Sequence, residues 1–155
     1  MSNWFTGSGE PISFNDVMLS MEAYVENGGK VFIGTDSQIK SDRCTFVTAI
    51  CLHGKLDKHY ATYFFNRQHL EKRGFETLRS RIMKEVQSSI DISMDLMEKY
   101  PLAEIEVHVD VGTTKRSATR QFVDTINGWV KGIGFKCKVK PYSWASSSIA
   151  DSHTK

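Results

Sequence analysis

The chain alternates between helical and strand-like spacing of its hydrophobic residues. Three stretches place apolar residues every three to four positions, the period of a helix with one buried face. The first runs from a cap at Ser13 or Asn15 to about residue 27, and the second covers residues 75–100. The third begins at Thr113 or Thr114 and ends at the glycines near residue 132.

Five other stretches have the composition and spacing of strands, rich in β-branched and aromatic residues. They cover residues 30–35, 44–52, 58–66, 104–110 and 135–139. Three strands come in succession and the others alternate with helices, an order typical of a mixed sheet. We therefore expect an α/β fold in which three antiparallel strands and then parallel crossovers form a five-stranded sheet, flanked by helices with an extra helix at the N-terminal end.

Length and charge narrow the range of functions. The 155 residues suit one domain, 1–155, with about residues 1–12 flexible. A net charge of +2 excludes a protein that coats nucleic acid by bulk electrostatics, so a nucleic-acid partner must be held by a local patch. No apolar run has the ~20 residues that span a bilayer, so we expect no membrane partner and a cytoplasmic location. The oligomeric state is left open.

Two aspartates come where predicted strands end. Asp36 follows the strand over residues 30–35, and Asp110 ends the strand over residues 104–110. Ligands of α/β proteins gather beyond the carboxyl ends of parallel strands, so the two side chains are expected to be neighbours. Two adjacent carboxylates repel unless a cation lies between them, and all-oxygen coordination favours Mg²⁺ or Mn²⁺.

Four segments carry a resemblance to a known family. They are residues 34–38 (GTDSQ), 75–77 (FET), 108–112 (HVDVG) and 145–151 (ASSSIAD). In this order they resemble the pattern of ribonuclease H-like proteins of the YkuK type, and the resemblance spans roughly residues 30–155.

The resemblance implies a ribonuclease H-like fold with four catalytic, metal-binding carboxylates. It places Asp36 on the first strand, Glu76 on the first crossover helix, Asp110 on the fourth strand and Asp151 on the last helix. In active members of the wider superfamily, carboxylates so placed bind two metal ions about 3.5–4 Å apart. The implied activity is Mg²⁺- or Mn²⁺-dependent hydrolysis of RNA, an RNA/DNA hybrid or DNA.

The residues themselves leave alternatives open. Glu85 lies on the same helix as Glu76 and competes with it for the role of helix carboxylate. His108 shares a strand face with Asp110, and we interpret it as a buried structural histidine. His153 is a candidate general base, proton shuttle or metal ligand, because imidazole titrates near neutral pH, and equally a candidate solvated residue near the C-terminal end.

Expected substrate contacts lie close to these carboxylates in the sequence. Ser37 follows Asp36, His153 follows Asp151, and Arg116 and Arg120 stand at the start of the helix after Asp110, where phosphates bind readily. Two other functions remain possible: a non-catalytic nucleic-acid- or protein-binding module with this fold, and a phosphohydrolase or phosphotransferase that uses the strand end at Asp36.

Overall fold

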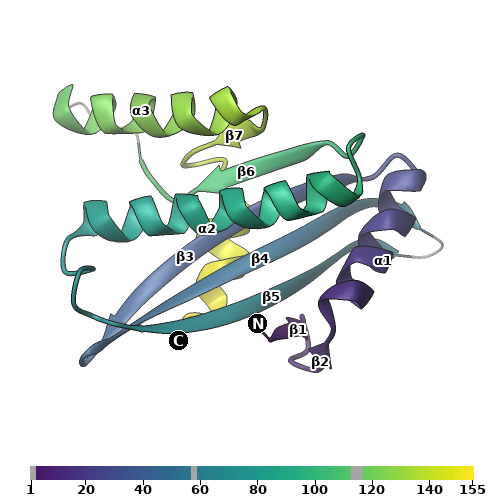
Figure 1. Cartoon of the computed structure of the whole chain (residues 1–155), viewed down its shortest axis with the longest axis horizontal. Helices are drawn as coiled ribbons and strands as arrows, with labels where there is room; N and C mark the ends of the chain where they lie inside the picture. The colour runs from purple at the N-terminus through teal and green to yellow at the C-terminus, as the bar shows by residue number, and fades with distance from the viewer. Residues whose placement is uncertain (1–2, 57–58, 113–116) are drawn as a thin grey trace.

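The computed structural model describes residues 3–56, 59–112 and 117–155, without the side chains of residues 55–59 and 113–120. Seven strands in this part of the chain form one sheet in the order β2-β1-β5-β4-β3-β6-β7 (Figure 1). The strands are β1 (Trp4–Thr6), β2 (Pro11–Ile12), β3 (Lys30–Lys40), β4 (Arg43–Leu56), β5 (His59–Glu71), β6 (Ile105–Val109) and β7 (Lys136–Lys138).

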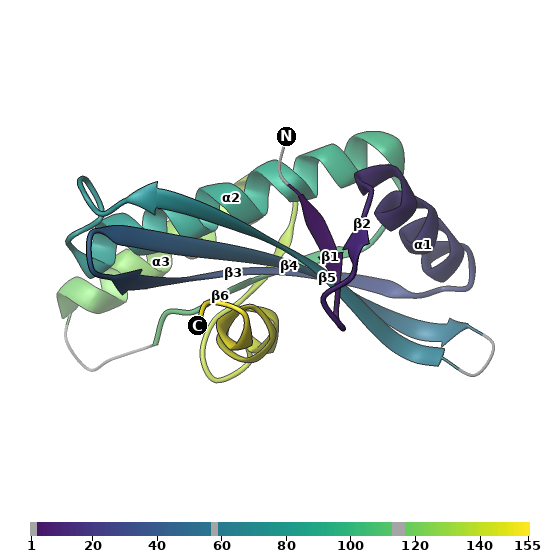
Figure 2. The ribbon, with the colours of Figure 1, turned by 90° about the horizontal axis from the view of Figure 1, so that it is seen from below.

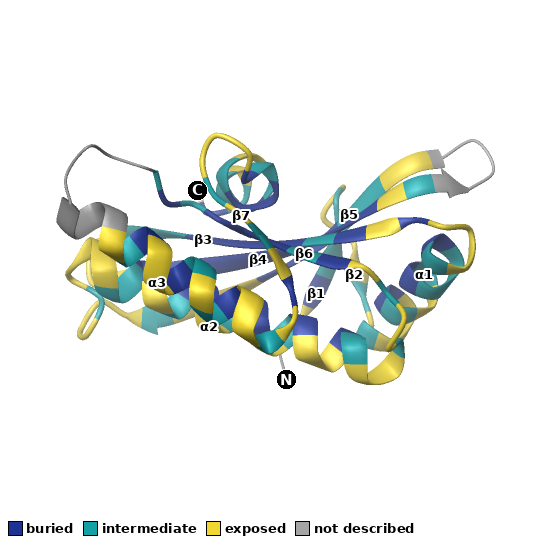
Figure 3. Ribbon diagram, turned by 90° about the horizontal axis from the view of Figure 1, so that it is seen from above, coloured by how far each residue is buried: buried dark blue, intermediate teal, exposed yellow. Residues whose placement is uncertain are grey.

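Helices cover both faces of this sheet. Three α-helices, α1 (Phe14–Glu26), α2 (Leu78–Lys99) and α3 (Ser117–Ile133), lie on one face, and the π-helical segment η1 (Ala145–Ala150) lies on the other (Figures 2 and 3). None of the described helices is long and apolar enough to cross a membrane.

Each face of the sheet has its own hydrophobic core. The larger core joins α1, α2 and α3 to the sheet, with Val31 and Ile33 of β3 at its centre. The smaller one joins η1 to β4 and β5 through Val47, Phe65 and Ala150. Successive strand residues point to opposite faces, so β3 contributes odd-numbered residues to the larger core and even-numbered ones to the η1 side.

The mixed α/β sheet is confirmed, but the expected number of five strands is wrong. β3, β4 and β5 form the antiparallel meander, and β3 pairs in parallel with β6, as β6 does with β7. The two additional strands are β1 and β2, a short hairpin that pairs with β5. This hairpin buries Trp4, whose ring stacks on Phe14 of α1 with centroids 5.6 Å apart.

The meander is also longer than expected. β3 and β4 remain paired from Lys30↔His53 to Lys40↔Arg43, and they turn at Ser41, whose φ is 56°. Asp36 therefore lies within β3, and not at its end. We call the part of the meander beyond the end of β6 the arm; it consists of residues 37–40, 43–47 and 67–71.

Candidate functional site

The site lies where β6 ends beside the middle of β3. The last parallel pair is Thr35↔Val109, so Asp36 and Asp110 are the next residues on the two strands. Because residues on neighbouring parallel strands follow one another in register, the two aspartates lie side by side at the point where the pairing of β3 with β6 ends. The sequence predicted this adjacency from strand ends, but here only β6 ends.

A third carboxyl group, that of Asp151, comes from the η1 side. The backbone of Ala145 and Ser146 lies so close to Gly34 that a Cβ at residue 34 would overlap it. This close approach needs a glycine on β3 and places the start of η1 on the even-numbered face, where Asp36 also points. Asp36 and Asp151 come close enough to share a hydrogen bond.

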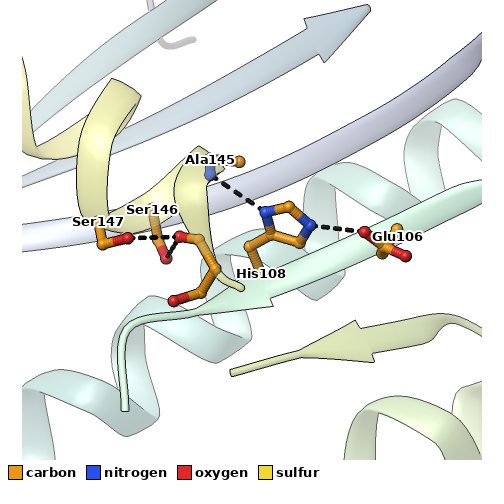
Figure 4. Close-up of polar contacts among 6 residues, drawn as sticks. Glu106, His108, Ala145, Ser146 and Ser147 are labelled. Atoms are coloured by element: carbon orange, nitrogen blue, oxygen red, sulfur yellow. Dashed lines mark hydrogen bonds and ion pairs between the residues drawn. The ribbon is translucent and has the colours of Figure 1, made fainter. Parts of the chain in front are cut away.

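His108 holds the first turn of η1 against β6. Its Nδ1 accepts a 3.1 Å hydrogen bond from the Ala145 amide, and its Nε2 lies 2.7 Å from Oε2 of Glu106 (Figure 4). The ring therefore carries its proton on Nε2. Burial lowers the pKa of His108, and Glu106 opposes this effect. These contacts agree with the predicted structural role of His108.

The fourth carboxyl group, that of Glu85, comes from α2. Ser37 Oγ donates a 2.5 Å hydrogen bond to Glu85 Oε2, which ties the start of the arm to this helix. One turn further along α2, Ser89 Oγ lies 2.7 Å from Thr35 Oγ1 in a buried contact. Two polar contacts therefore fix the position of α2 beside Asp36 and Asp110.

Burial and charge together perturb Asp36. Asp36 is only 7% exposed to solvent. Burial, the hydrogen bond with Asp151 and the negative charge of Asp110 raise the pKa of Asp36 to about 8. A carboxyl group that is surrounded by other carboxyl groups keeps its proton to neutral pH. Such perturbed groups are concentrated at functional sites.

Glu85 is perturbed in the same direction. Burial raises the pKa of Glu85 well above its usual value, and the charges of Asp36 and Asp110 add to this rise. The hydrogen bond from Ser37 and the charge of Arg81 act against it. The charge of Asp110 therefore raises the pKa of both Glu85 and Asp36, although the two come from different elements.

Asp110 forms an ion pair with a lysine. Lys140 Nζ lies 3.0 Å from Asp110 Oδ1, with the lysine side chain half exposed. Oδ1 is buried and forms no hydrogen bond within the described residues, so the contact with Lys140 is an ion pair without hydrogen-bond geometry. The positive charge of Lys140 therefore lies beside an oxygen of Asp110 that no described group hydrogen-bonds.

We call Asp36, Glu85, Asp110 and Asp151 the carboxylate cluster. Its donors are all oxygens, the type that Mg²⁺ and Mn²⁺ prefer. As placed, no three acidic, histidine or cysteine side chains in the described parts of the chain are close enough to enclose a metal ion. The cluster has the chemistry of a divalent-cation site, and metal binding requires its side chains to draw closer together.

The structure does not bring Glu76 to this cluster. The expected helix over residues 75–100 begins only at Leu78, because Thr77 is its N-cap and accepts from the Ser80 amide. Glu76 therefore precedes the helix. It is exposed, and its carboxylate accepts a 3.0 Å hydrogen bond from the Gly74 amide.

The expected substrate contacts have different outcomes. Ser37 lies in the site as the partner of Glu85. His153 packs face to face on Phe65, with ring centroids 3.8 Å apart, and its Nε2 lies 3.0 Å from the Tyr63 hydroxyl. Burial, and then the charge of Arg67, lowers the pKa of His153. Arg116 and the side chain of Arg120 lie outside the described residues.

One signal in the sequence pointed to Glu85. It falls within the helical stripe of Ile82, Val86 and Ser89, all of which are buried, and a carboxylate in such a stripe needs a polar reason to be there. No comparable signal marks Lys140, because its position depends on how the chain returns from β7 to η1.

Comparisons with known proteins agree with this architecture. The profile of the family described as Ribonuclease H-like matches residues 13–155. The uncharacterized protein YkuK of Bacillus subtilis (strain 168) is 27% identical over 165 aligned positions, which cover 93% of this chain and 92% of the relative. No solved structure matches the chain significantly.

Proposed function

Because this chain belongs to the ribonuclease H-like family and is of the YkuK type, we propose that it is a metal-dependent nuclease. It hydrolyses phosphodiester bonds in RNA, an RNA/DNA hybrid or DNA. The carboxylate cluster is the proposed catalytic centre, with Glu85 in place of Glu76 as the helix carboxylate. Mg²⁺ or Mn²⁺ is the proposed cofactor.

One observation carries this proposal: four acidic residues far apart in the sequence interact at the end of β6. Asp36 responds to Asp110 and Asp151, and Glu85 responds to Asp36 and Asp110. Natural proteins rarely bury carboxyl groups beside one another without a function, because a charged carboxylate raises the free energy needed to ionise its neighbour. A shared divalent cation offsets this repulsion.

The chain's own groups have distinct roles in this proposal. Asp36 and Asp110 would hold the metal from the two strands, and Glu85 and Asp151 from the two faces of the sheet. A bound Mg²⁺ would polarise a phosphate oxygen of the substrate and lower the pKa of a water molecule. Ser37 orients Glu85 through its hydrogen bond, and Lys140 provides a positive charge beside Asp110 that can contact a phosphate.

The test is a cleavage assay on labelled RNA, DNA and RNA/DNA hybrid in the presence of Mg²⁺ or Mn²⁺. Asp36→Asn and Asp110→Asn should reduce cleavage to background while both variants keep their circular dichroism spectrum. Asp124→Asn, at an exposed position on α3, is the matched control and should cleave like the wild type. Equal cleavage by all four proteins would contradict the proposal.

One observation favours a second function, that of a non-catalytic nucleic-acid-binding module. No three ligand groups in the described residues surround a metal position as placed. Such a module would bind the same oligonucleotides but would neither bind Mn²⁺ at millimolar concentration nor cleave. Calorimetric titration with Mn²⁺ separates the two functions.

A further inference from the structure

The face of the arm on the η1 side carries a row of basic residues that leads to the carboxylate cluster. Antiparallel pairing places Asp36 opposite Val47 and Val47 opposite Arg67, so these three share one face. Lys40 and Arg43 form the outermost pair of the same face. Lys40, Arg43 and Arg67 are all exposed.

The arm is more basic than the protein as a whole. Its residues 37–40, 43–47 and 67–71 contain three lysines and arginines against one acidic residue, Glu71. Glu71 is the register partner of Arg43, but neither Arg43 nor Lys40 forms an ion pair within the described residues. Their charges are therefore available to an external anion.

The geometry of a sheet gives the size of this surface. Lys40 is four residues from Asp36 along β3, which is about 13 Å at ~3.3 Å per residue. Arg67 lies on β5, two strands across the sheet from Asp36 on β3, which is about 10 Å at ~4.8 Å per strand. A nucleic-acid strand has one phosphate per ~3.4 Å of helix axis. The row therefore matches the backbone of about four nucleotides that approach the cluster.

Two neighbouring side chains add to this surface. The ring of His69 is exposed and is held by Thr45, whose Oγ1 lies 2.9 Å from Nδ1. Arg67 lies over the ring of Phe65 at 5.0 Å and donates from Nε to the His153 carbonyl at 2.8 Å. Both groups are thereby oriented on the open face, where an unpaired base can stack on the imidazole ring.

From these observations we infer that the η1-side face of the arm, formed by Lys40, Arg43, Arg67 and His69, binds the phosphate backbone of the nucleic acid and guides it to the carboxylate cluster. This inference rests on the proposed function. The cluster itself repels phosphates, so binding free energy must come from cations beside it, and phosphate contacts dominate the affinity of proteins for nucleic acids.

The test measures binding apart from cleavage. Fluorescence anisotropy with a labelled single-stranded RNA is recorded over a salt series for the Asp36→Asn protein without divalent metal. In this background the pair Lys40→Ala and Arg43→Ala should weaken binding several-fold and reduce the slope of log K against log salt by about 1.4, at ~0.7 per lost phosphate contact. The matched pair Lys99→Ala and Lys131→Ala removes the same charge at the ends of α2 and α3, and should change neither.

Equal effects of the two pairs, or an unchanged salt slope for the arm pair, would overturn the inference. Because no turnover is measured, that result leaves the proposed nuclease activity standing. Conversely, an arm-specific loss of binding, together with a wild-type protein that does not cleave in the presence of Mg²⁺ or Mn²⁺, supports the surface and contradicts the nuclease alone. Variants of Arg67 are left out of this pair because Arg67 also holds the C-terminal segment.

Discussion

The hydroxyl of Ser37 donates to the carboxylate of Glu85, and this single contact joins the strand that carries Asp36 to the helix on the opposite face of the sheet. The two residues are 48 positions apart in sequence. Their contact explains how a helix that packs on one face contributes to a site whose other members come from the strand ends and from η1.

The first prediction concerns this contact. Ser37→Ala removes the hydrogen bond that opposes the raised pKa of Glu85, so the carboxylate is charged less readily and is no longer oriented. Mn²⁺ affinity at neutral pH should fall by about 10–100-fold, the usual effect of losing a group that orients a metal ligand. Calorimetry measures this change, and Ser20→Ala on α1 should leave the affinity unchanged.

The second prediction concerns Gly34, which lets η1 approach β3. Gly34→Ala would drive a methyl group into the backbone of Ala145 and Ser146, and should lower the free energy of unfolding by about 1–3 kcal/mol. The control is Gly132→Ala on α3, where nothing lies within 4 Å of the added Cβ. Urea denaturation compares the two, and equal stabilities would contradict the packing described for η1.

The third prediction concerns His108. His108→Leu leaves the Ala145 amide without its acceptor and should cost about 1–3 kcal/mol of stability, measured by urea denaturation. His108→Gln offers an amide oxygen and should restore part of the loss. A leucine variant as stable as the wild type would show that this hydrogen bond does not hold η1.

The fourth prediction concerns pH. The pKa of Asp36 is about 8 in the folded protein, whereas aspartate in an unfolded chain titrates near 4. The folded state thus binds this proton more tightly, so the stability that Asp36 contributes is fully present below about pH 4 and is lost as pH rises through about 8. Thermal unfolding of the metal-free protein should show this decline.

Asp36→Asn removes the titrating group and should flatten the decline between pH 5 and pH 8. The Asp124→Asn control should keep the wild-type profile. Parallel profiles for all three proteins would contradict the perturbed state of Asp36.

The sequence predicted the pair of aspartates better than it predicted the elements around them. Asp36 and Asp110 were identifiable because each follows a segment with a strand pattern, and these two strands pair in parallel. The β1–β2 hairpin escaped prediction because its strands have three and two residues, too few to show a period of two. The parts of the arm at residues 37–40 and 67–71 escaped because their mostly polar residues resemble a loop, while their order comes from pairing with β4.

The helix carboxylate shows a different limit. Glu76 and Glu85 are both on or near α2, and the choice between them depends on where that helix begins and which face it buries. The cap at Thr77 leaves Glu76 outside the helix, and packing against β3 turns Glu85 towards Asp36. The helical stripe indicated that Glu85 is buried, but neither the start of the helix nor the proximity of Glu85 to Asp36 can be read from local spacing alone.

The most direct measurement of the central claim is calorimetric titration of Mn²⁺ into the wild type and two matched variants, Glu85→Gln and Glu76→Gln. Both variants remove one negative charge from the same region of the chain. If the carboxylate cluster holds the metal, Glu85→Gln weakens Mn²⁺ binding by at least tenfold and Glu76→Gln leaves it unchanged. The opposite ranking, or no Mn²⁺ binding by the wild type at millimolar concentration, would contradict the claim.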